Sequence, residues 1–207
     1  MNNVKIGNAT ILNVDCMEYM RTLPDKYFDL AIVDPPYGLN KSCMTGAGKL
    51  KNRAIQGNTT WDIAPSKDYF IELRRVSFNQ IIWGGNYFEL PPARGIICWD
   101  KLQPWSNFSA WEMAWTSIDC VARIFKLDNR SSDKIHPTQK PIKLYEWLLT
   151  NYAKPGQTIF DSHMGSGSSA IACNNLGFEF VGCELDNDYY DAACKRIEHH
   201  YSQAKLF

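Results

Sequence analysis

Short apolar runs alternate with segments of helical periodicity along most of the chain. The runs typical of buried strands lie at 10–14, 29–33, 80–83, 158–161 and 178–184. Apolar positions at helical spacing lie at 17–22, 66–78, 142–151 and 189–201, and a further helix follows Gly167. Strands that alternate with helices build parallel βαβ units, so the pattern predicts an α/β fold.

The middle of the chain has a different pattern. Segments 95–99, 112–117 and 121–127 are rich in β-branched and aromatic residues, which predicts antiparallel strands. A chain of 207 residues is long enough for one domain with a substantial core. We therefore expect a single domain, 1–207, with a small antiparallel insert at about 95–135.

Composition narrows the class of protein. The formal net charge is zero, so any contact with nucleic acid has to come from local basic patches. No apolar run reaches the length of a membrane span. The seven cysteines form no C-x-x-C pair, and the four histidines do not cluster with them at zinc spacing. The sequence predicts a cytoplasmic protein without metal, whose cysteines are mostly small buried apolar residues.

The tetrapeptide Asp34-Pro35-Pro36-Tyr37 directly follows the apolar run 28–33. Proline continues neither a sheet ladder nor a helix, so the strand ends here and leaves the Pro35 carbonyl without a ladder partner. The Asp34 carboxylate and this carbonyl can accept both hydrogens of an exocyclic amino group, while Tyr37 stacks on the base that carries it. Such a base first has to leave the duplex. Taken alone, the four residues fit an ordinary Pro-Pro turn with a surface tyrosine better.

A glycine turn lies far downstream, between the strand at 158–161 and a helix. Its small residues allow close approach to a ligand, although many strand-to-helix turns contain a Gly-x-Gly. The dinucleotide fingerprint G-x-G-x-x-G is absent because Ala170 stands three positions after Gly167, which argues against a pyrophosphate ligand. The candidate cofactor residues of the turn are Asp161, Met164, Gly165, Ser166, Gly167 and Ser168.

The run at 178–184 ends in Glu184, at the position where doubly wound folds bind a ribose hydroxyl pair. A ribose without phosphates fits an adenosyl cofactor. Alternatively, Glu184 is a neighbour of a helix N-cap, because Asp186, Asn187 and Asp188 follow it. The preceding glycine turn favours the cofactor interpretation.

A third segment, HPTQKP at 136–141, precedes the predicted helix at 142–151. In this order, the DPPY tetrapeptide, the HPTQKP segment and the glycine turn resemble the beta-class amino methyltransferases, which are circularly permuted DNA enzymes. The resemblance runs from about Asp15 to Tyr201. It implies a Rossmann-like, mostly parallel sheet with helices on both faces, in circularly permuted methyltransferase order, with a target-recognition insert at about 95–135.

The resemblance also implies a cofactor and a substrate. The cofactor is S-adenosyl-L-methionine, which Asp34 also adjoins, and the substrate is double-stranded DNA with one base flipped out. The strand of Asp161 is expected between those of Asp34 and Glu184. Asp15 then lies beside the cofactor adenine, although it fits an N-cap of the helix after it equally well. Lys140 either contacts the methionine carboxylate or covers the pocket.

One segment departs from the family pattern. Where the family has Asp-Pro-Phe before the glycine turn, this chain has Asp161-Ser162-His163. The change either loosens the turn, or gives it a titratable neighbour, or is a tolerated variation, since the aspartate and both glycines remain.

Two loops carry the information about the substrate. Residues 38–60 form a long stretch of little periodicity, placed either to close on a flipped nucleotide and its phosphates or to act as a solvated connector. Residues 100–115 mix aromatic and polar groups, which either contact bases or belong to the core of the insert. The candidate DNA-binding residues of the first loop are Lys41, Lys49, Lys51 and Arg53.

We therefore expect methyl transfer to adenine N6, carried out by Asp34, Pro35, Pro36 and Tyr37. Cytosine N4 is the nearest alternative, but many cytosine enzymes of the family carry serine before the prolines. RNA adenine methylation and a non-catalytic DNA-binding protein of the same fold are further alternatives. The sequence is compatible with a restriction-modification enzyme, a phage or orphan methylase, and a homodimer.

Replacing Lys49, Lys51 and Arg53 together by alanine should weaken DNA binding and flatten its dependence on salt. Fewer neutralised phosphates release fewer counterions, so the magnitude of the slope of log K against log salt should fall by about 0.9 for each phosphate that is no longer neutralised. Fluorescence anisotropy titrations at several salt concentrations measure this slope. Cofactor affinity should hardly change, and an unaltered slope would leave the loop as a solvated connector.

Overall fold

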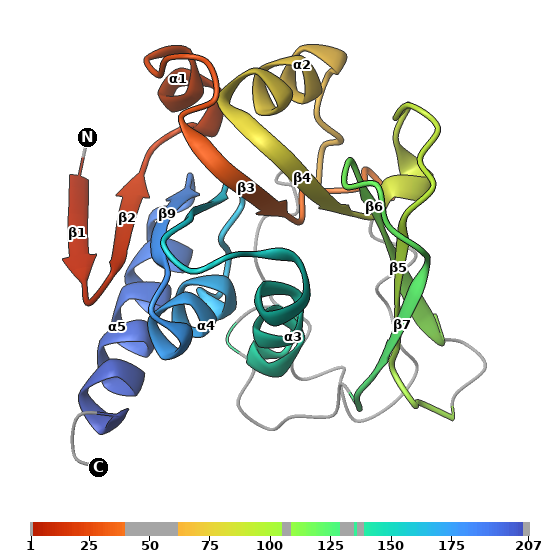
Figure 1. Cartoon of the computed structure of the whole chain (residues 1–207). Helices are drawn as coiled ribbons and strands as arrows, with labels where there is room; N and C mark the ends of the chain where they lie inside the picture. The colour runs from red at the N-terminus through yellow and green to blue at the C-terminus, as the bar shows by residue number, and fades with distance from the viewer. Residues whose placement is uncertain (1, 40–61, 105–108, 129–134, 136–138, 205–207) are drawn as a thin grey trace.

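The computed structural model describes residues 2–39, 62–104, 109–128, 135 and 139–204, which fold into a mixed sheet with helices on both faces (Figure 1). The strands are β1 (Asn2–Ile6), β2 (Ala9–Asn13), β3 (Phe28–Val33), β4 (Ser77–Trp83), β5 (Ile96–Asp100), β6 (Trp111–Thr116), β7 (Arg123–Lys126), β8 (Thr158–Asp161) and β9 (Glu179–Glu184). The helices are α1 (Cys16–Arg21), α2 (Lys67–Val76), the short 3-10 helix η4 (Gly85–Tyr87), α3 (Ile142–Tyr152), α4 (Ser168–Leu176) and α5 (Asn187–Ala204).

The centre of the sheet is parallel, as the sequence predicts. The strand order is β1-β2-β9-β8-β3-β4-β6-β5-β7, and each neighbouring pair from β2 to β4 is parallel. The prediction that the Asp161 strand lies between those of Asp34 and Glu184 is confirmed, because β8 lies between β3 and β9. These strands run in one direction, so all three acids lie at the same edge of the sheet.

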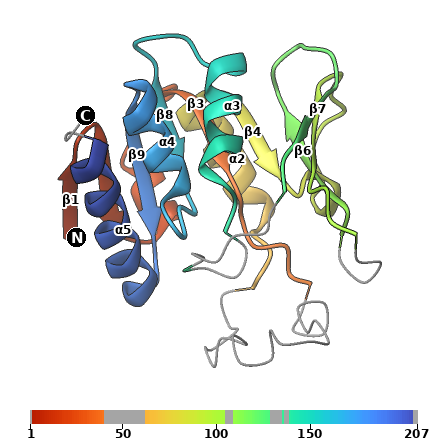
Figure 2. The same ribbon diagram turned by 90° about the horizontal axis from the view of Figure 1, so that it is seen from below.

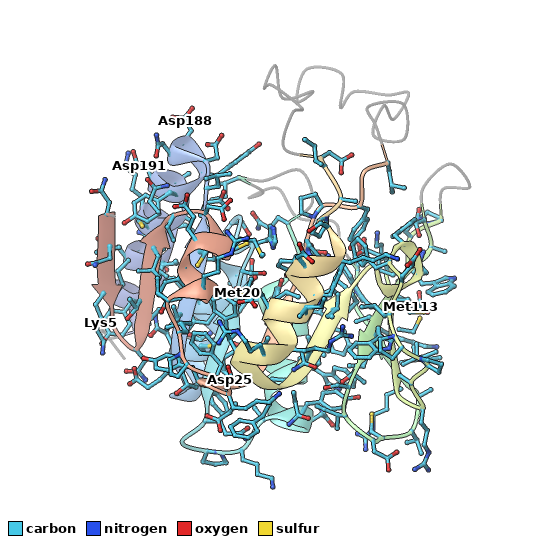
Figure 3. The ribbon with its side chains drawn as sticks, turned by 90° about the horizontal axis from the view of Figure 1, so that it is seen from above. Lys5, Met20, Asp25, Met113, Asp188 and Asp191 are labelled. Carbon is cyan, nitrogen blue, oxygen red and sulfur yellow. The ribbon has the colours of Figure 1, made fainter. Side chains whose placement is uncertain are left out.

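Alternating residues of the central strands build two cores, one on each face of the sheet. In β3, Leu30 and Ile32 belong to the core covered by α3, α4 and α5. Ala31 and Val33 belong to the core covered by α1 and α2. Figure 2 views the first face, and Figure 3 views the second, where the buried Met20 of α1 is labelled. Burial on both faces explains why this strand is an almost continuous apolar run.

The hairpin of β1 and β2 is missing from the sequence-based prediction. Gly7 and Asn8 alone connect Ile6 to its partner Ala9. Gly7 has a φ of 62°, the conformation that a type II′ turn requires at its first central position. The signal for this hairpin in the sequence is the two-residue Gly-Asn connection itself.

The end of helix α2 and the pairing of segment 121–127 differ from the prediction. Helix α2 ends at Val76 and not at 78, because Ser77 is already extended, with φ −129° and ψ 145°, and begins β4. The segment predicted as an antiparallel strand at 121–127 becomes β7, which pairs parallel to β5. The chain direction reverses from β5 to β6 and again from β6 to β7, so β5 and β7 run in the same direction. Because β7 pairs with β5 and not with β6, the pair is parallel.

The edge strands β6, β5 and β7 continue the main sheet beyond β4. The β4–β6 and β5–β6 pairs are antiparallel, as predicted for this region. Within the described ranges, no helix is both long and apolar enough to cross a membrane.

Replacing Phe160 of β8 by alanine should lower the free energy of unfolding by about 3–5 kcal/mol, because a buried ring is removed and a cavity remains. The Phe160 ring stacks on Phe28 of β3, with centroids 4.4 Å apart and planes 4° from parallel. Urea denaturation followed by circular dichroism measures the loss. The matched control is Phe78→Ala at a ring that is 58% exposed, where the change should stay within about 0.5 kcal/mol. Equal losses in the two variants would contradict this packing.

Candidate active site

The DPPY tetrapeptide leaves the sheet at the carboxyl end of β3 and turns back toward β4. The Tyr37 hydroxyl donates a hydrogen bond to Asp34 Oδ1 at 2.7 Å. The Tyr37 ring lies against Gly84, where an added Cβ would be 2.3 Å from its Cε1, and Gly84 has a φ of 68°. Burial and the Asp34 charge raise the pKa of Tyr37 well above its usual value, so the hydroxyl remains a donor.

An aromatic pair lies beside Asp34. The rings of Tyr37 and Tyr87 stack with centroids 4.8 Å apart and planes 22° from parallel. One face of Tyr37 is therefore covered by Tyr87. The stacking on a base that the sequence predicts for Tyr37 needs its other face or a displacement of Tyr87.

Four charged side chains of alternating sign connect the tetrapeptide to the edge strands. Lys140, just before α3, contacts Asp34 Oδ2, and its Nζ lies 3.1 Å from Glu112 Oε2 on β6. The other Glu112 oxygen contacts Lys101 Nζ, just after β5. We call Asp34, Lys140, Glu112 and Lys101 the charged tetrad. The sequence did not indicate a site role for Glu112, because no local pattern joins it to Asp34.

The two inner members of the charged tetrad remain ionised. Burial alone would lower the pKa of Lys140, but the charges of Asp34 and Glu112 raise it. Burial alone would raise the pKa of Glu112, but Lys140 and Lys101 bring it down to about 2. The sequence predicts a cofactor contact for Lys140, which stays a prediction, since the described partners of its Nζ are these two carboxylates.

The glycine turn between β8 and α4 is closed by Glu184. The Gly165 amide donates to Glu184 Oε2 at 2.9 Å, and the Asp186 amide donates to Oε1 at 3.0 Å. Gly165 and Gly167 have φ values of 53° and 74°, which explains the glycine at both positions. The capping interpretation also holds nearby, because Asp186 Oδ1 accepts from the amides of residues 188 and 189 at the start of α5.

Helix α5 holds the same turn from outside, through residues that the sequence did not indicate. Arg196 donates to the Ser166 carbonyl at 2.7 Å and to Ser168 Oγ at 3.0 Å. Ile197 fills the space next to Gly167, where an added Cβ would lie 2.8 Å from Ile197 Cδ1. The buried Met164 completes the turn, with its amide donating to the Cys183 carbonyl of β9 at 3.0 Å.

Asp161 is buried at the end of β8. Its carboxylate accepts from Ser169 Oγ at 2.7 Å and from the His163 amide at 3.1 Å. Burial raises its pKa to about 7, against these two hydrogen bonds, and the neighbouring acids Asp34 and Glu184 add to the rise.

Ser162 and His163, the two residues that differ from the family pattern, both contact Tyr69 of helix α2. Ser162 Oγ lies 2.6 Å from Tyr69 Oη and 2.9 Å from His163 Nδ1. The Tyr69 and His163 rings meet edge to face at 5.4 Å. Burial lowers the pKa of His163 to about 4, so this neighbour of the glycine turn is a neutral imidazole at physiological pH.

Asp15 lies next to the Glu184 strand, since the Val14 amide donates to the Glu184 carbonyl at 3.1 Å. Its Oδ1 accepts from the amides of Met17 at 2.8 Å and Glu18 at 3.1 Å. The N-cap interpretation of Asp15 is confirmed, and its contact with an adenine stays a prediction.

The predicted DNA-binding residues Lys41, Lys49, Lys51 and Arg53 lie outside the described residues, as do residues 136–138 of the HPTQKP segment. The described chain on either side of the first gap is joined at the tetrapeptide, because the Gly38 amide donates to Asp62 Oδ1 at 2.9 Å. In the part of the chain that the structure describes, no group of three or more His, Cys, Asp and Glu side chains is placed to hold a metal ion.

The chemistry of this edge favours a positively charged ligand with hydroxyl groups. Asp34, Asp161 and Glu184 end or follow three adjacent strands, and, beyond the effect of burial, the charges of Asp34 and Glu184 raise the pKa of Asp161 between them. Carboxylates repel phosphate groups and accept hydrogen bonds from hydroxyls. The glycine turn beside them allows a ligand to approach the backbone closely.

Comparison with known proteins gives matches over most of the chain. The family model N6_N4_Mtase, described as DNA methylase, matches residues 82–195. The Type II methyltransferase M.HinfI of Haemophilus influenzae is 24% identical over an alignment 245 residues long. The alignment covers 91% of this chain and 68% of that protein. The M1.HpyAVI-SAM complex has a TM-score of 0.60 and 22% identity, covering 91% of this chain and 99% of that one.

A second solved structure, the PvuII DNA methyltransferase, is described as cytosine-N4-specific. It has a TM-score of 0.63 and 15% identity, and the match covers 95% of this chain and 92% of that one. At this identity, the two solved structures support a shared fold.

Asp161 and His163 should give opposite pH dependences of stability. The pKa of Asp161 rises from its usual 3.8 to about 7 on folding, so its contribution is lost as pH rises through that window. The pKa of His163 falls from 6.5 to about 4, so its contribution is lost as pH falls through that window. Between about pH 4 and 6.5 the two contributions oppose each other.

Single substitutions should expose each contribution. Relative to the parent, Asp161→Asn should make the free energy of unfolding rise more steeply with pH between about 4 and 6.5, and His163→Gln should make it rise less steeply or fall. Each group contributes at most about 1.4 kcal/mol per pH unit. Urea denaturation at three pH values in this window measures the slopes. Parent-like slopes in both variants would contradict the burial of these groups.

Proposed function

Because this chain belongs to the DNA methylase family N6_N4_Mtase, we propose that it transfers a methyl group from S-adenosyl-L-methionine to the exocyclic N6 of an adenine flipped out of double-stranded DNA. The observation that carries the proposal is the position of Asp34. This carboxylate directly follows β3, the strand next to β8, and its charge acts on Asp161 at the start of the glycine turn. An amino-group acceptor and a cofactor turn therefore share one edge of the sheet.

The residues around the glycine turn fit this cofactor. S-Adenosyl-L-methionine supplies an electrophilic methyl group on a positively charged sulfur. In this proposal the remaining lone pairs of Glu184 accept hydrogen bonds from ribose hydroxyls, and the nearby acids favour a cation without phosphates. The M1.HpyAVI-SAM complex, which shares the fold, supports this assignment. The proposed cofactor-binding residues are Asp15, Lys140, Asp161, Met164, Gly165, Ser166, Gly167, Ser168 and Glu184. Asp34 adjoins the cofactor but is proposed to act on the substrate amino group.

Asp34 and the Pro35 carbonyl act on the substrate amino group. The lone pair of this nitrogen is delocalised into the ring, so the free base is a poor nucleophile. By accepting both amino hydrogens, the two acceptors localise the lone pair and aim it at the methyl carbon. The nitrogen bonds to that carbon as the carbon–sulfur bond breaks, and the amino group then releases one proton to solvent.

Tyr37 and Pro36 organise these acceptors. The Tyr37 hydroxyl holds one oxygen of Asp34. The proposed stacking of its ring on the base uses the face away from Tyr87 or follows a displacement of Tyr87. Pro36 fixes the backbone that presents the Pro35 carbonyl, since its ring restricts φ to near −65°.

Adenine is proposed over cytosine because aspartate precedes the two prolines. Cytosine N4 remains the second candidate, since the cytosine-N4-specific PvuII enzyme has a similar fold. Digesting DNA from expressing cells to nucleosides, followed by mass spectrometry, distinguishes the two bases. N4-methylcytosine alone would overturn the choice of base, and methylation confined to RNA would overturn the choice of nucleic acid. A parent enzyme that methylates neither would overturn the proposed function.

Asp34→Asn should reduce kcat for DNA methylation by about 100- to 1000-fold, the usual cost of removing one preorganised polar contact to a transition state. The dissociation constant for S-adenosyl-L-methionine, measured by calorimetry, should change by less than about threefold, because the carboxylate acts on the amino group. The matched control is Asp191→Asn at an exposed acid of α5, labelled in Figure 3, which should alter neither value. A fully active Asp34→Asn enzyme would refute the mechanism.

A further inference from the structure

The charged tetrad contains a buried ammonium beside the carboxylate that is proposed to act on the substrate amino group. Lys140 has a side chain that is only 3% exposed, yet it carries a full charge against two carboxylates. Buried charges are costly unless they are paired, so an ammonium at this position strongly affects the groups around it. One of those groups is the catalytic carboxylate Asp34.

An ammonium that pairs with Asp34 alone would oppose the reaction. The substrate nitrogen becomes positively charged as it gains the methyl group, and a negative Asp34 stabilises that charge. An ion pair formed by Asp34 and Lys140 alone has no net charge, so it stabilises the positive charge on the substrate nitrogen less than a free carboxylate does. In a site of low dielectric constant, this difference has a large effect on the rate.

The geometry divides Lys140 between two carboxylates. Its Nζ contacts Asp34 Oδ2 and lies 3.1 Å from Glu112 Oε2. With Glu112 included, the group of two acids and one lysine carries one net negative charge. Lys101 contacts Glu112 Oε1, the oxygen that does not face Lys140. Its positive charge makes the whole tetrad neutral, but it is separated from Asp34 by Glu112 and Lys140.

Rigid elements hold this arrangement in place. Glu112 lies opposite Trp99 in the β5–β6 ladder, which fixes its backbone. The Lys140 ammonium lies 5.2 Å from the centroid of the Trp83 ring, and Lys101 lies 5.4 Å from that of Trp99. Both indole rings are buried, so they exclude water from one side of the tetrad and add cation–π attraction.

We propose that Glu112 is a positioning residue for methyl transfer. It shares the Lys140 ammonium with Asp34 and so preserves the negative charge of Asp34 for the reacting amino group. The inference rests on the proposed function and adds to it a residue of the edge strand β6. It also gives the edge strands a direct connection to the catalytic carboxylate.

Glu112→Gln tests the proposal, because glutamine keeps the size of the side chain and removes its charge. Lys140 then has Asp34 as its single described carboxylate partner. The single-turnover rate of methyl transfer should fall about 10- to 100-fold, in line with the loss of one charge near the reacting nitrogen. Dissociation constants for cofactor and DNA should change by less than about threefold. An unchanged rate would overturn the proposal.

A matched control separates this effect from the loss of any glutamate charge. Glu89 pairs with Lys67 at 2.6 Å on the surface, where both side chains are exposed. Glu89→Gln should leave the single-turnover rate at the parent value, because solvent screens an exposed pair that contacts no member of the tetrad in the described structure.

The double variant Glu112→Gln/Lys140→Met distinguishes positioning from a merely structural role. Removing the lysine frees Asp34 from its closed ion pair, so the double variant should transfer methyl groups at least about fivefold faster than Glu112→Gln at saturating cofactor. A structural role predicts the opposite order, because a second member of the buried ion-pair network is removed. If Glu112→Gln fails to fold, the double variant, which lacks both the Glu112 and the Lys140 charge, still tests the proposal. A single-turnover rate more than about 100-fold below that of the parent would then overturn it.

A crystal structure of Glu112→Gln separates this inference from the proposed function. If the parent transfers no methyl group, the function is wrong, while the positioning claim still predicts that Lys140 Nζ leaves residue 112 and remains on Asp34. A Lys140 side chain that keeps both partners in the variant would overturn the positioning claim alone.

Discussion

Carboxylates that lose water at the edge of a parallel sheet have to gain donors, and the local structure of this site follows from that requirement. Asp34 is held by a lysine and a tyrosine hydroxyl, and Glu184 by two backbone amides. Asp15 accepts two amides at the start of α1. Each set of donors comes from a different element, so satisfying the acids also fixes the tetrapeptide, the glycine turn and the first helix in place.

Asp161 differs because its side chain is fully buried, whereas Asp15, Asp34 and Glu184 are only partly buried. A hydroxyl and an amide do not offset the cost of burial in full, and its pKa therefore stays near 7. His163, which donates one of these hydrogen bonds through its backbone, is itself held neutral by burial. At neutral pH, Asp161 thus carries only part of a negative charge and His163 is uncharged.

The parts of the site that the sequence indicates are local in the chain. A strand followed by two prolines, or by a glycine turn, has a physical meaning within a few residues, and so the sequence indicates both Asp34 and the turn at Gly165. The order of the central strands came from the family resemblance. The predicted ends of helices are less accurate. Helix α5, for example, is predicted from residue 189 but begins at Asn187, after a cap at Asp186.

The charged tetrad was beyond sequence reasoning for a physical reason. Its members come from β3, β5, β6 and the segment before α3, and they meet only because β6 pairs with β4 and β5 adds outside it. The pairing of β7 is similar, since its direction follows from which edge of the hairpin it joins. Contacts that depend on the order of strands in the sheet produce no characteristic spacing of residues in the sequence, so the sequence does not predict them.

The hydrogen bond between Gly38 and Asp62 has a consequence for the geometry of the sheet edge. The chain leaves the sheet edge that carries the three acids and returns to it at one closed junction, so a change in the length of the intervening segment does not have to move the sheet. Loop closure depends only weakly on length, at about 0.6 kcal/mol for each doubling. The acids at the sheet edge therefore keep their geometry through described residues on both sides of this junction, and that geometry does not depend on the length of chain between Gly38 and Asp62.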